Sequence, residues 1–130
     1  MNFGVGGAGT ENVLWRLQNG ELKGTSPRVI VLRIGTNDSD FKLADEIATG
    51  VTAVVRMLRT NLPQAKILLL GIFPRGNPFR SRTDAANPII ARLDDGKMIR
   101  YLDVGSHLLD KDGNLLPGVL GDEVHLTPKG

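Results

Sequence analysis

The chain has 130 residues, of which 41% are hydrophobic and 23% are charged, and its formal net charge is +2. This length suits one domain with a buried core. So small a net charge argues against a surface built to bind nucleic acid. Cysteine is absent, which excludes disulfides, thiolate metal ligands and a cysteine nucleophile. No apolar run is long enough to span a bilayer, and the sequence leaves the cellular compartment open.

Short apolar segments predict the strands of a parallel sheet. They cover residues 29–34, 66–72 and 98–103 and are rich in valine, isoleucine and leucine. Continuous apolar runs of this length are typical of strands that are covered on both faces. The segment Asn2-Phe3-Gly4 predicts the end of a further strand.

Helical patterns lie between these strands. The predicted helices cover residues 10–19, 47–62 and 85–93. Thr10 is a candidate N-cap of the first helix, and Pro63 ends the second. Pro88 must lie in the first turn of the third helix or kink it. Trp15 is expected in the core.

The alternation of strands and helices predicts an α/β fold with a parallel sheet. In such sheets, ligands bind outside the carboxyl ends of the strands. The segments that follow predicted strand ends are Gly7, Asn37, residues 73–82 and the loop-rich region after Asp103. We expect them to lie at one edge of the sheet and to form one site.

The pair Asp122 and His125 is a candidate acid–base unit. An acid three residues before a histidine can hold one ring nitrogen and leave the other as a base. The second histidine, His107, has no acid at that spacing. A histidine taken alone is more often structural or exposed, and the neighbouring acid favours the catalytic interpretation of His125.

Two further segments could stabilise an oxyanion. The side-chain amide of Asn37 can donate a hydrogen bond to developing negative charge. The alternative is that Asn37 and Asp38 only turn the chain after the strand. Gly6 and Gly7 allow close ligand approach and offer a backbone N–H as a second donor. A phosphate-binding loop is the competing interpretation, but the lysine of a P-loop is absent.

A group of arginines follows the second predicted strand, at positions 75, 80 and 82. They could form a solvated loop, or a wall of the site that meets a polar or anionic group of the substrate. The sequence gives these two interpretations equal weight.

Blocks spread along the chain stand in a definite order. They are residues 2–7 (NFGVGG), 13–22 (VLWRLQNGEL), 35–38 (GTND), 70–75 (LGIFPR) and 122–127 (DEVHLT). In composition, order and spacing they resemble the SGNH (GDSL-type) hydrolase family, and within it the platelet-activating-factor acetylhydrolase Ib catalytic-subunit type and its bacterial relatives.

The resemblance implies a three-layer α/β/α fold with a flavodoxin-like parallel sheet, and ester hydrolysis without a metal or cofactor. The roles that it implies are backbone oxyanion donor for Gly7, side-chain donor for Asn37, general base for His125 and orienting acid for Asp122. Asp38 and Arg75 are expected to contact the substrate.

The family's nucleophile is the serine of a Gly-Asp-Ser motif at the end of its first strand, and this sequence has no such motif. Its serines are Ser26, Ser39, Ser81 and Ser106. We therefore expect residues 1–130 to form a single incomplete SGNH domain that lacks the first strand and the last helix. The family strand order puts the missing strand between the segments 2–4 and 29–34, where a gap would leave backbone groups unpaired.

The functional hypotheses differ in class. The first is a serine esterase or acetylhydrolase that acts on a small-molecule ester of a lipid or carbohydrate. The second is a non-catalytic binding or assembly module that keeps the fold and the pocket. A nucleotide-binding domain is a weaker third hypothesis. We expect no nucleic-acid partner and no membrane span, and a homodimer or strand-swapped oligomer is one way to fill the gap.

Overall fold

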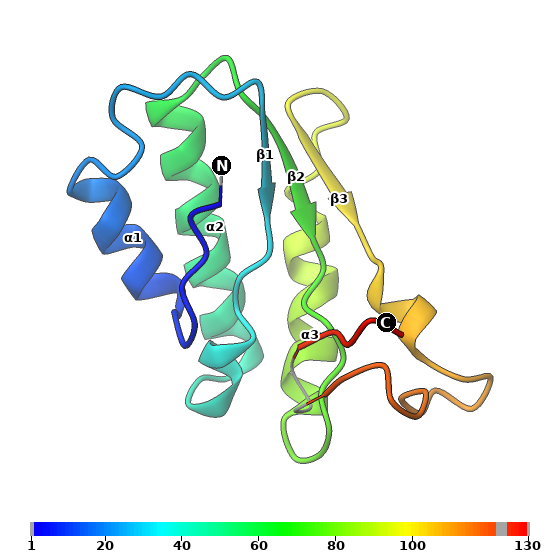
Figure 1. The fold of residues 1–130 in the computed structure, drawn as a ribbon. Helices are drawn as coiled ribbons and strands as arrows, with labels where there is room; N and C mark the ends of the chain where they lie inside the picture. The colour runs from blue at the N-terminus through cyan, green and yellow to red at the C-terminus, as the bar shows by residue number, and fades with distance from the viewer. Residues whose placement is uncertain (1, 122–124, 130) are drawn as a thin grey trace.

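The computed structural model describes residues 2–121 and 125–129. Its sheet has three strands, β1 (Val29–Leu32), β2 (Lys66–Leu70) and β3 (Ile99–Leu102). They are parallel and adjacent in the order β1-β2-β3, as Figure 1 shows. The predicted α/β class with a parallel sheet is thus confirmed.

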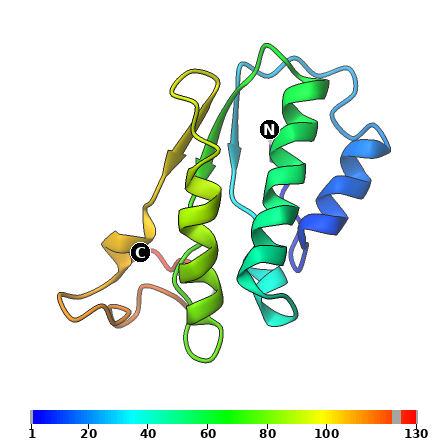
Figure 2. The ribbon, with the colours of Figure 1, turned by 180° about the vertical axis from the view of Figure 1, so that it is seen from behind.

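The α-helices of the described residues are α1 (Thr10–Gln18), α2 (Ala44–Asn61) and α3 (Arg80–Ala91). Two short 3-10 helices, η1 (Asn37–Asp40) and η2 (Gly105–Leu108), follow β1 and β3. In Figures 1 and 2, α2 and α3 lie side by side against one face of the sheet, and α1 lies beside α2.

The main core lies between the sheet and the helices α2 and α3. Its fully buried side chains include Ile47, Val51, Val54 and Val55 of α2, Ile67 and Leu69 of β2, and Ala86 and Ile90 of α3. The residues of α2 recur at helical spacing, which is the pattern that predicted this helix. Strand residues alternate in direction, so Ile67 and Leu69 point to the helices.

The opposite face of the sheet stays open among the described residues. Val29 and Val31 of β1 are 57% and 62% exposed, and Leu102 of β3 is 47% exposed. These valines point away from the helices because side chains alternate along a strand. Within the part of the chain that the structure describes, β1 pairs with β2 alone, so its outer edge is unpaired as well.

Some sequence predictions were wrong in detail. The segment Asn2-Phe3-Gly4 is irregular and not a strand, since the Asn2 side chain accepts a bond from Gly4 N (2.8 Å) and no strand lies beside it. Trp15 is 64% exposed, because the buried side of α1 carries Thr10 and Leu17. Pro88 lies within α3, beyond its first turn, so of the two placements predicted for it the first turn is excluded.

The C-terminal segment after β3 is loop-rich, as predicted. Its described part contains η2 and two isolated antiparallel bridges, Leu109 with Leu115 and Leu120 with Leu126. A small second core of Phe73, Leu108 and Val119 holds this segment against the chain after β2. No helix among the described residues is long and apolar enough to cross a membrane.

Candidate active site

A cavity of about 1010 Å³ lies along the outer edge of β1. Its walls are the N-terminal segment 2–8, residues 29–37 of β1 and the turn after it, part of α1 and its loop, and His125. Three of the predicted site residues, Gly7, Asn37 and His125, therefore line one cavity. The sequence had placed them at one edge of the sheet, and the structure brings them together.

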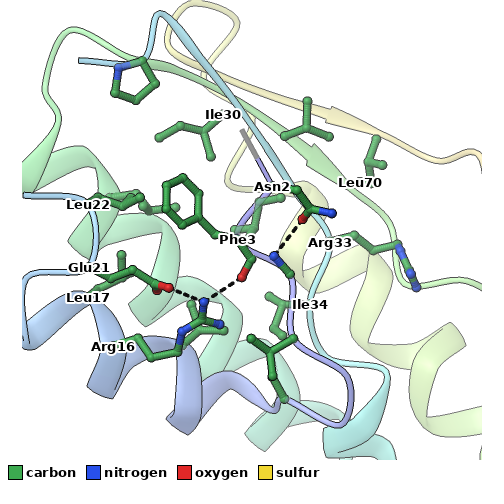
Figure 3. Close-up of a pocket in the computed structure, with 18 of the residues that line it drawn as sticks. Asn2, Phe3, Arg16, Leu17, Glu21, Leu22, Ile30, Arg33, Ile34 and Leu70 are labelled. Atoms are coloured by element: carbon green, nitrogen blue, oxygen red, sulfur yellow. Dashed lines mark hydrogen bonds and ion pairs between the residues drawn. The ribbon is translucent and has the colours of Figure 1, made fainter. Parts of the chain in front are cut away.

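Arg16 holds the N-terminal segment across this cavity. Its Nη2 donates to the carbonyl oxygen of Phe3 (2.7 Å) and pairs with Glu21, as Figure 3 shows. On another wall, the guanidinium of Arg33 lies 4.4 Å from the centre of the Phe73 ring. Phe3 is thus bound to Arg16 of α1 through its carbonyl oxygen, and among the described residues it belongs to no strand.

Gly7 lies in a turn that presents its backbone N–H. Ala8 N donates to Val5 O (3.3 Å), which closes the turn, and Gly7 has a φ of +76°, a conformation that favours glycine. Among the described residues, the N–H of Gly7 donates to no protein acceptor. It has the properties that an oxyanion donor needs.

Asn37 begins η1 just after β1. Its Nδ2 donates to the carbonyl oxygen of Ala8 (3.0 Å), next to Gly7. An amide nitrogen carries two hydrogens, so this bond fixes the orientation of the amide and leaves a second N–H for a ligand. The two candidate donors therefore belong to loops that are joined by a hydrogen bond.

Asp38 has protein partners in place of the substrate contact expected of it. It is 5% exposed, and its carboxylate accepts bonds from Thr10 N (3.0 Å to Oδ2) and Thr10 Oγ1 (2.8 Å to Oδ1). Lys42 Nζ lies 3.1 Å from Oδ1. Hydrogen bonds to Glu11 and to Asp38 raise the pKa of Lys42. No local sequence signal predicts the contact with Thr10, because the two residues are 28 positions apart.

Arg75 also binds the protein itself. Its Nη1 donates to Ser39 Oγ (2.9 Å) and pairs with Asp40, and its guanidinium lies 4.5 Å from the centre of the Phe79 ring. Arg82 Nη1 donates to the carbonyl oxygen of Ser39 (2.7 Å). These arginines hold η1 in place, so this part of the predicted site wall supports the loop that carries Asn37.

No serine among the described residues has the position of a nucleophile. Ser39 is fully buried, and its Oγ donates to Thr36 O (2.6 Å) while it accepts from Arg75. Ser26 lines the cavity before β1 begins, whereas Asn37 follows the end of that strand. The four residues of β1 alone separate its two ends by about 10 Å.

His125 lines the cavity and is exposed, and its carbonyl oxygen accepts from Gly121 N (2.9 Å). Asp122, the predicted orienting acid, lies outside the described residues. The described residues contain no group of three or more His, Cys, Asp or Glu side chains that could hold a metal ion.

A comparison with known protein families bears on the residues that line the cavity. A model of the GDSL-like lipase/acylhydrolase family matches residues 1–130. The chain belongs to this family. The resemblance seen in the sequence blocks is therefore confirmed over the whole length of the chain.

Curated relatives and solved structures agree with this assignment. Platelet-activating factor acetylhydrolase IB subunit alpha2 from Homo sapiens is 40% identical over 134 residues, which cover 100% of this chain and 58% of the relative. The alpha1 subunit from Homo sapiens is 35% identical over the same share of each chain. This family member thus spans less than three fifths of the length of these relatives.

A solved protein described as a platelet activating factor, from Streptococcus pneumonia, superposes with a TM-score of 0.82 at 24% identity, covering 98% of this chain and 64% of that one. Est24, a carbohydrate acetylesterase from Sinorhizobium meliloti, superposes with a TM-score of 0.66 at 16% identity, covering 89% and 60%. At these identities the superpositions show the SGNH hydrolase fold alone.

Proposed function

We propose that the protein is a serine esterase that removes a short acyl group, acetyl in the first instance, from an ester of a lipid or a carbohydrate. The observation that carries this proposal is the single cavity lined by Gly7, Asn37 and His125 in a chain of the GDSL-like family. The printed names of the relatives and of the acetylesterase neighbour support the choice of an acetyl ester.

In the proposed reaction, the carbonyl oxygen of the ester lies between Gly7 N and Asn37 Nδ2. Both donors stabilise the negative charge that develops when a serine attacks the carbonyl carbon. The imidazole of His125 accepts the proton of the serine and returns it to the leaving alcohol. Water then hydrolyses the acyl-enzyme with His125 as the base again. Asp122 is assigned the role of orienting the imidazole.

We propose that the attacking serine comes from a segment that is not among these 130 residues. Two observations support this. Ser39 is buried, Ser81 and Ser106 do not line the cavity, and Ser26 lines it before β1 begins. The matched region leaves about two fifths of the length of the human relative unmatched. The cavity runs along the edge of β1 that has no strand partner among the described residues, where an added strand could pair and bring a serine to the carboxyl end of the sheet.

The test is active-site labelling of the product of the complete reading frame with an organophosphate, followed by mass spectrometry. We expect one serine to be labelled, and the same protein to hydrolyse p-nitrophenyl acetate. His125→Ala should abolish both, because nucleophile and base act as a unit. Asn37→Ala should slow turnover by about 10²–10³-fold, the usual loss for one oxyanion donor.

Matched controls separate the site from the fold. His107→Ala removes the other histidine, which is exposed on η2, and should leave labelling intact. The 130-residue chain should show little or no turnover, and Ser39→Ala should not change that. If no serine is labelled in the product of the complete reading frame, the proposal that the protein is a serine esterase is rejected. The non-catalytic binding module of the same fold would then be the better assignment.

A further inference from the structure

The carboxylate of Asp38 is the most heavily bonded polar group near the site. It is 5% exposed and accepts from the N–H and the hydroxyl of Thr10 and from Lys42. The reaction proposed above gives it no step. A buried carboxylate with this many donors is costly to remove, since each donor would lose its partner.

Asp38 accepts a hydrogen bond at the start of α1, as the side chain of an N-cap residue would, although it lies 28 positions from Thr10. The N-cap residue of α1 is Gly9, which has no side chain to accept from the first turn. Asp38 accepts from Thr10 N instead, and its negative charge lies at the positive end of the helix. The position of α1, and of the Gly7 turn that leads into it, thus depends on a residue of η1.

Neighbouring residues of η1 hold both sides of Gly9. Asn37 Nδ2 donates to the carbonyl oxygen of Ala8, and Asp38 accepts from Thr10 N. The approach is close, because a Cβ built on Gly9 would lie 3.3 Å from both carboxylate oxygens of Asp38. The turn that presents Gly7 is therefore fixed relative to the amide of Asn37 by consecutive residues.

Thr10, the hydrogen-bond partner of Asp38, packs against Gly50 of α2. A Cβ on Gly50 would lie 2.3 Å from Thr10 Oγ1, so the glycine leaves the space that the threonine side chain fills. Thr10 is 1% exposed. On the solvent side, Lys42 joins Asp38 to Glu11 of α1 (Nζ to Oε1, 3.0 Å). Thr10 has little freedom to move while Asp38 is charged and bonded.

We propose that Asp38 is a positioning residue that holds the backbone N–H of Gly7 and the side-chain amide of Asn37 so that both donate to one oxygen atom. The inference rests on the proposed function, because it assigns a role within that oxyanion site. Asp38 acts through Thr10 and does not touch the substrate. Its removal should loosen the Gly7 turn relative to Asn37 and weaken the binding of negative charge between them.

The test uses acetate as the probe and the product of the complete reading frame as the protein. Acetate is titrated while NMR records the Gly7 backbone amide and the Asn37 side-chain NH₂ resonances. We expect both to shift together in the unchanged chain. Asp38→Ala should weaken acetate binding by about ten-fold or more, as expected for misplacing a charge-assisted donor. Because the resonances report the folded molecules, a change in stability alone would not move this affinity.

Variants of the partners make the test specific. Thr10→Ser keeps the hydroxyl and should keep acetate affinity, whereas Thr10→Val removes it and should lower the affinity a few-fold. Glu11→Gln removes only the ion pair with Lys42, in which the Glu11 side chain is 81% exposed, so it should change the affinity by less than about two-fold, and by less than Thr10→Val does. If Asp38→Ala does not fold, the comparison of Thr10→Val with Thr10→Ser decides the question.

The outcomes are distinguishable. Equal acetate affinity in the unchanged chain and in Asp38→Ala or Thr10→Val would overturn the role of Asp38 and leave the oxyanion site standing. If acetate shifts neither Gly7 nor Asn37 in the unchanged chain, the oxyanion site of the proposed function fails, and the role of Asp38 fails with it.

Discussion

At the scale of single residues, the polar groups around η1 and the Gly7 turn divide into two sets. Asn37 and the Gly7 backbone face the cavity, while Asp38, Ser39 and Arg75 hold η1 and the start of α1. This division matters for mutagenesis. If Gly7 and Asn37 act as proposed, we expect loss of activity in a variant of the second group to report a displaced donor and not a lost contact with substrate.

Gly50 offers a test of the packing behind Thr10. In the interior of a helix such as α2, Gly→Ala normally stabilises by about 1 kcal/mol. At Gly50 the added Cβ would lie 2.3 Å from Thr10 Oγ1, so we expect Gly50→Ala to destabilise by about 1–3 kcal/mol instead. Urea denaturation followed by circular dichroism measures the difference.

Gly6→Ala is the matched control for Gly50→Ala, because a Cβ on Gly6 meets nothing within 4 Å. It should change the free energy of unfolding by less than about 0.5 kcal/mol. A stabilising Gly50→Ala would show that Thr10 can move aside, and would weaken the argument that it is held in place.

The residues that line the cavity could be predicted, and those that support it could not. Gly7, Asn37 and His125 each belong to a short block that the family resemblance picks out. The bond between Thr10 and Asp38 depends on folding, because the two residues are 28 positions apart and the local pattern around each says nothing of the other. The placement of Ser39 inside the fold follows from η1, which the sequence did not predict.

At the scale of elements, the sequence predicted the helices and strands whose apolar side chains are buried. It was wrong about segments whose apolar side chains are partly exposed. The helix α2 and the strand β2 bury a regular set of apolar side chains, so the spacing of their apolar residues matches the side that is buried. The apolar run of β1 predicted a strand covered on both faces, but Val29 and Val31 are exposed. Asn2-Phe3-Gly4 has the composition of a strand end, but a strand forms only when another strand pairs with it. Trp15 is apolar but lies on the exposed side of α1.

Two aspartates just before β3, Asp94 and Asp95, predict that the folded protein loses stability in acid. The carboxylate of Asp95 accepts from the backbone N–H groups of Lys97, Met98 and Ile99, each at 2.9 Å. These bonds, that from Ile99 first, lower the pKa of Asp95. Backbone bonds, that from Tyr101 first, likewise lower the pKa of Asp94. A lowered pKa in the folded state adds stability above the pKa of the unfolded chain.

That stability is lost as the pH falls through the folded-state pKa. We therefore expect the unfolding temperature to drop as the pH falls below about 4, the ordinary pKa of an aspartate. Asp95→Asn should lower stability at neutral pH and reduce this dependence on pH. The control is Asp112→Asn, whose side chain makes no hydrogen bond or ion pair among the described residues. An unchanged pH slope in Asp95→Asn would contradict the assignment.

At the scale of the whole molecule, the described chain leaves one side of its sheet uncovered. The outer edge of β1 has no strand partner among the described residues, and Val29 and Val31 next to that edge are more than half exposed. An unpaired edge beside exposed apolar side chains favours association with another strand. We expect the 130-residue chain to self-associate, and the edge of β1 to be the surface involved.

Val31→Lys tests this expectation, because a lysine on an edge strand opposes pairing with a second chain. It should lower the apparent molecular mass in sedimentation velocity while the circular dichroism spectrum stays the same. Leu43→Lys is the matched control, since Leu43 is 63% exposed against 62% for Val31 but precedes α2, away from the sheet edge. A monomeric unchanged chain, or an equal effect of both substitutions, would show that the edge of β1 does not drive association.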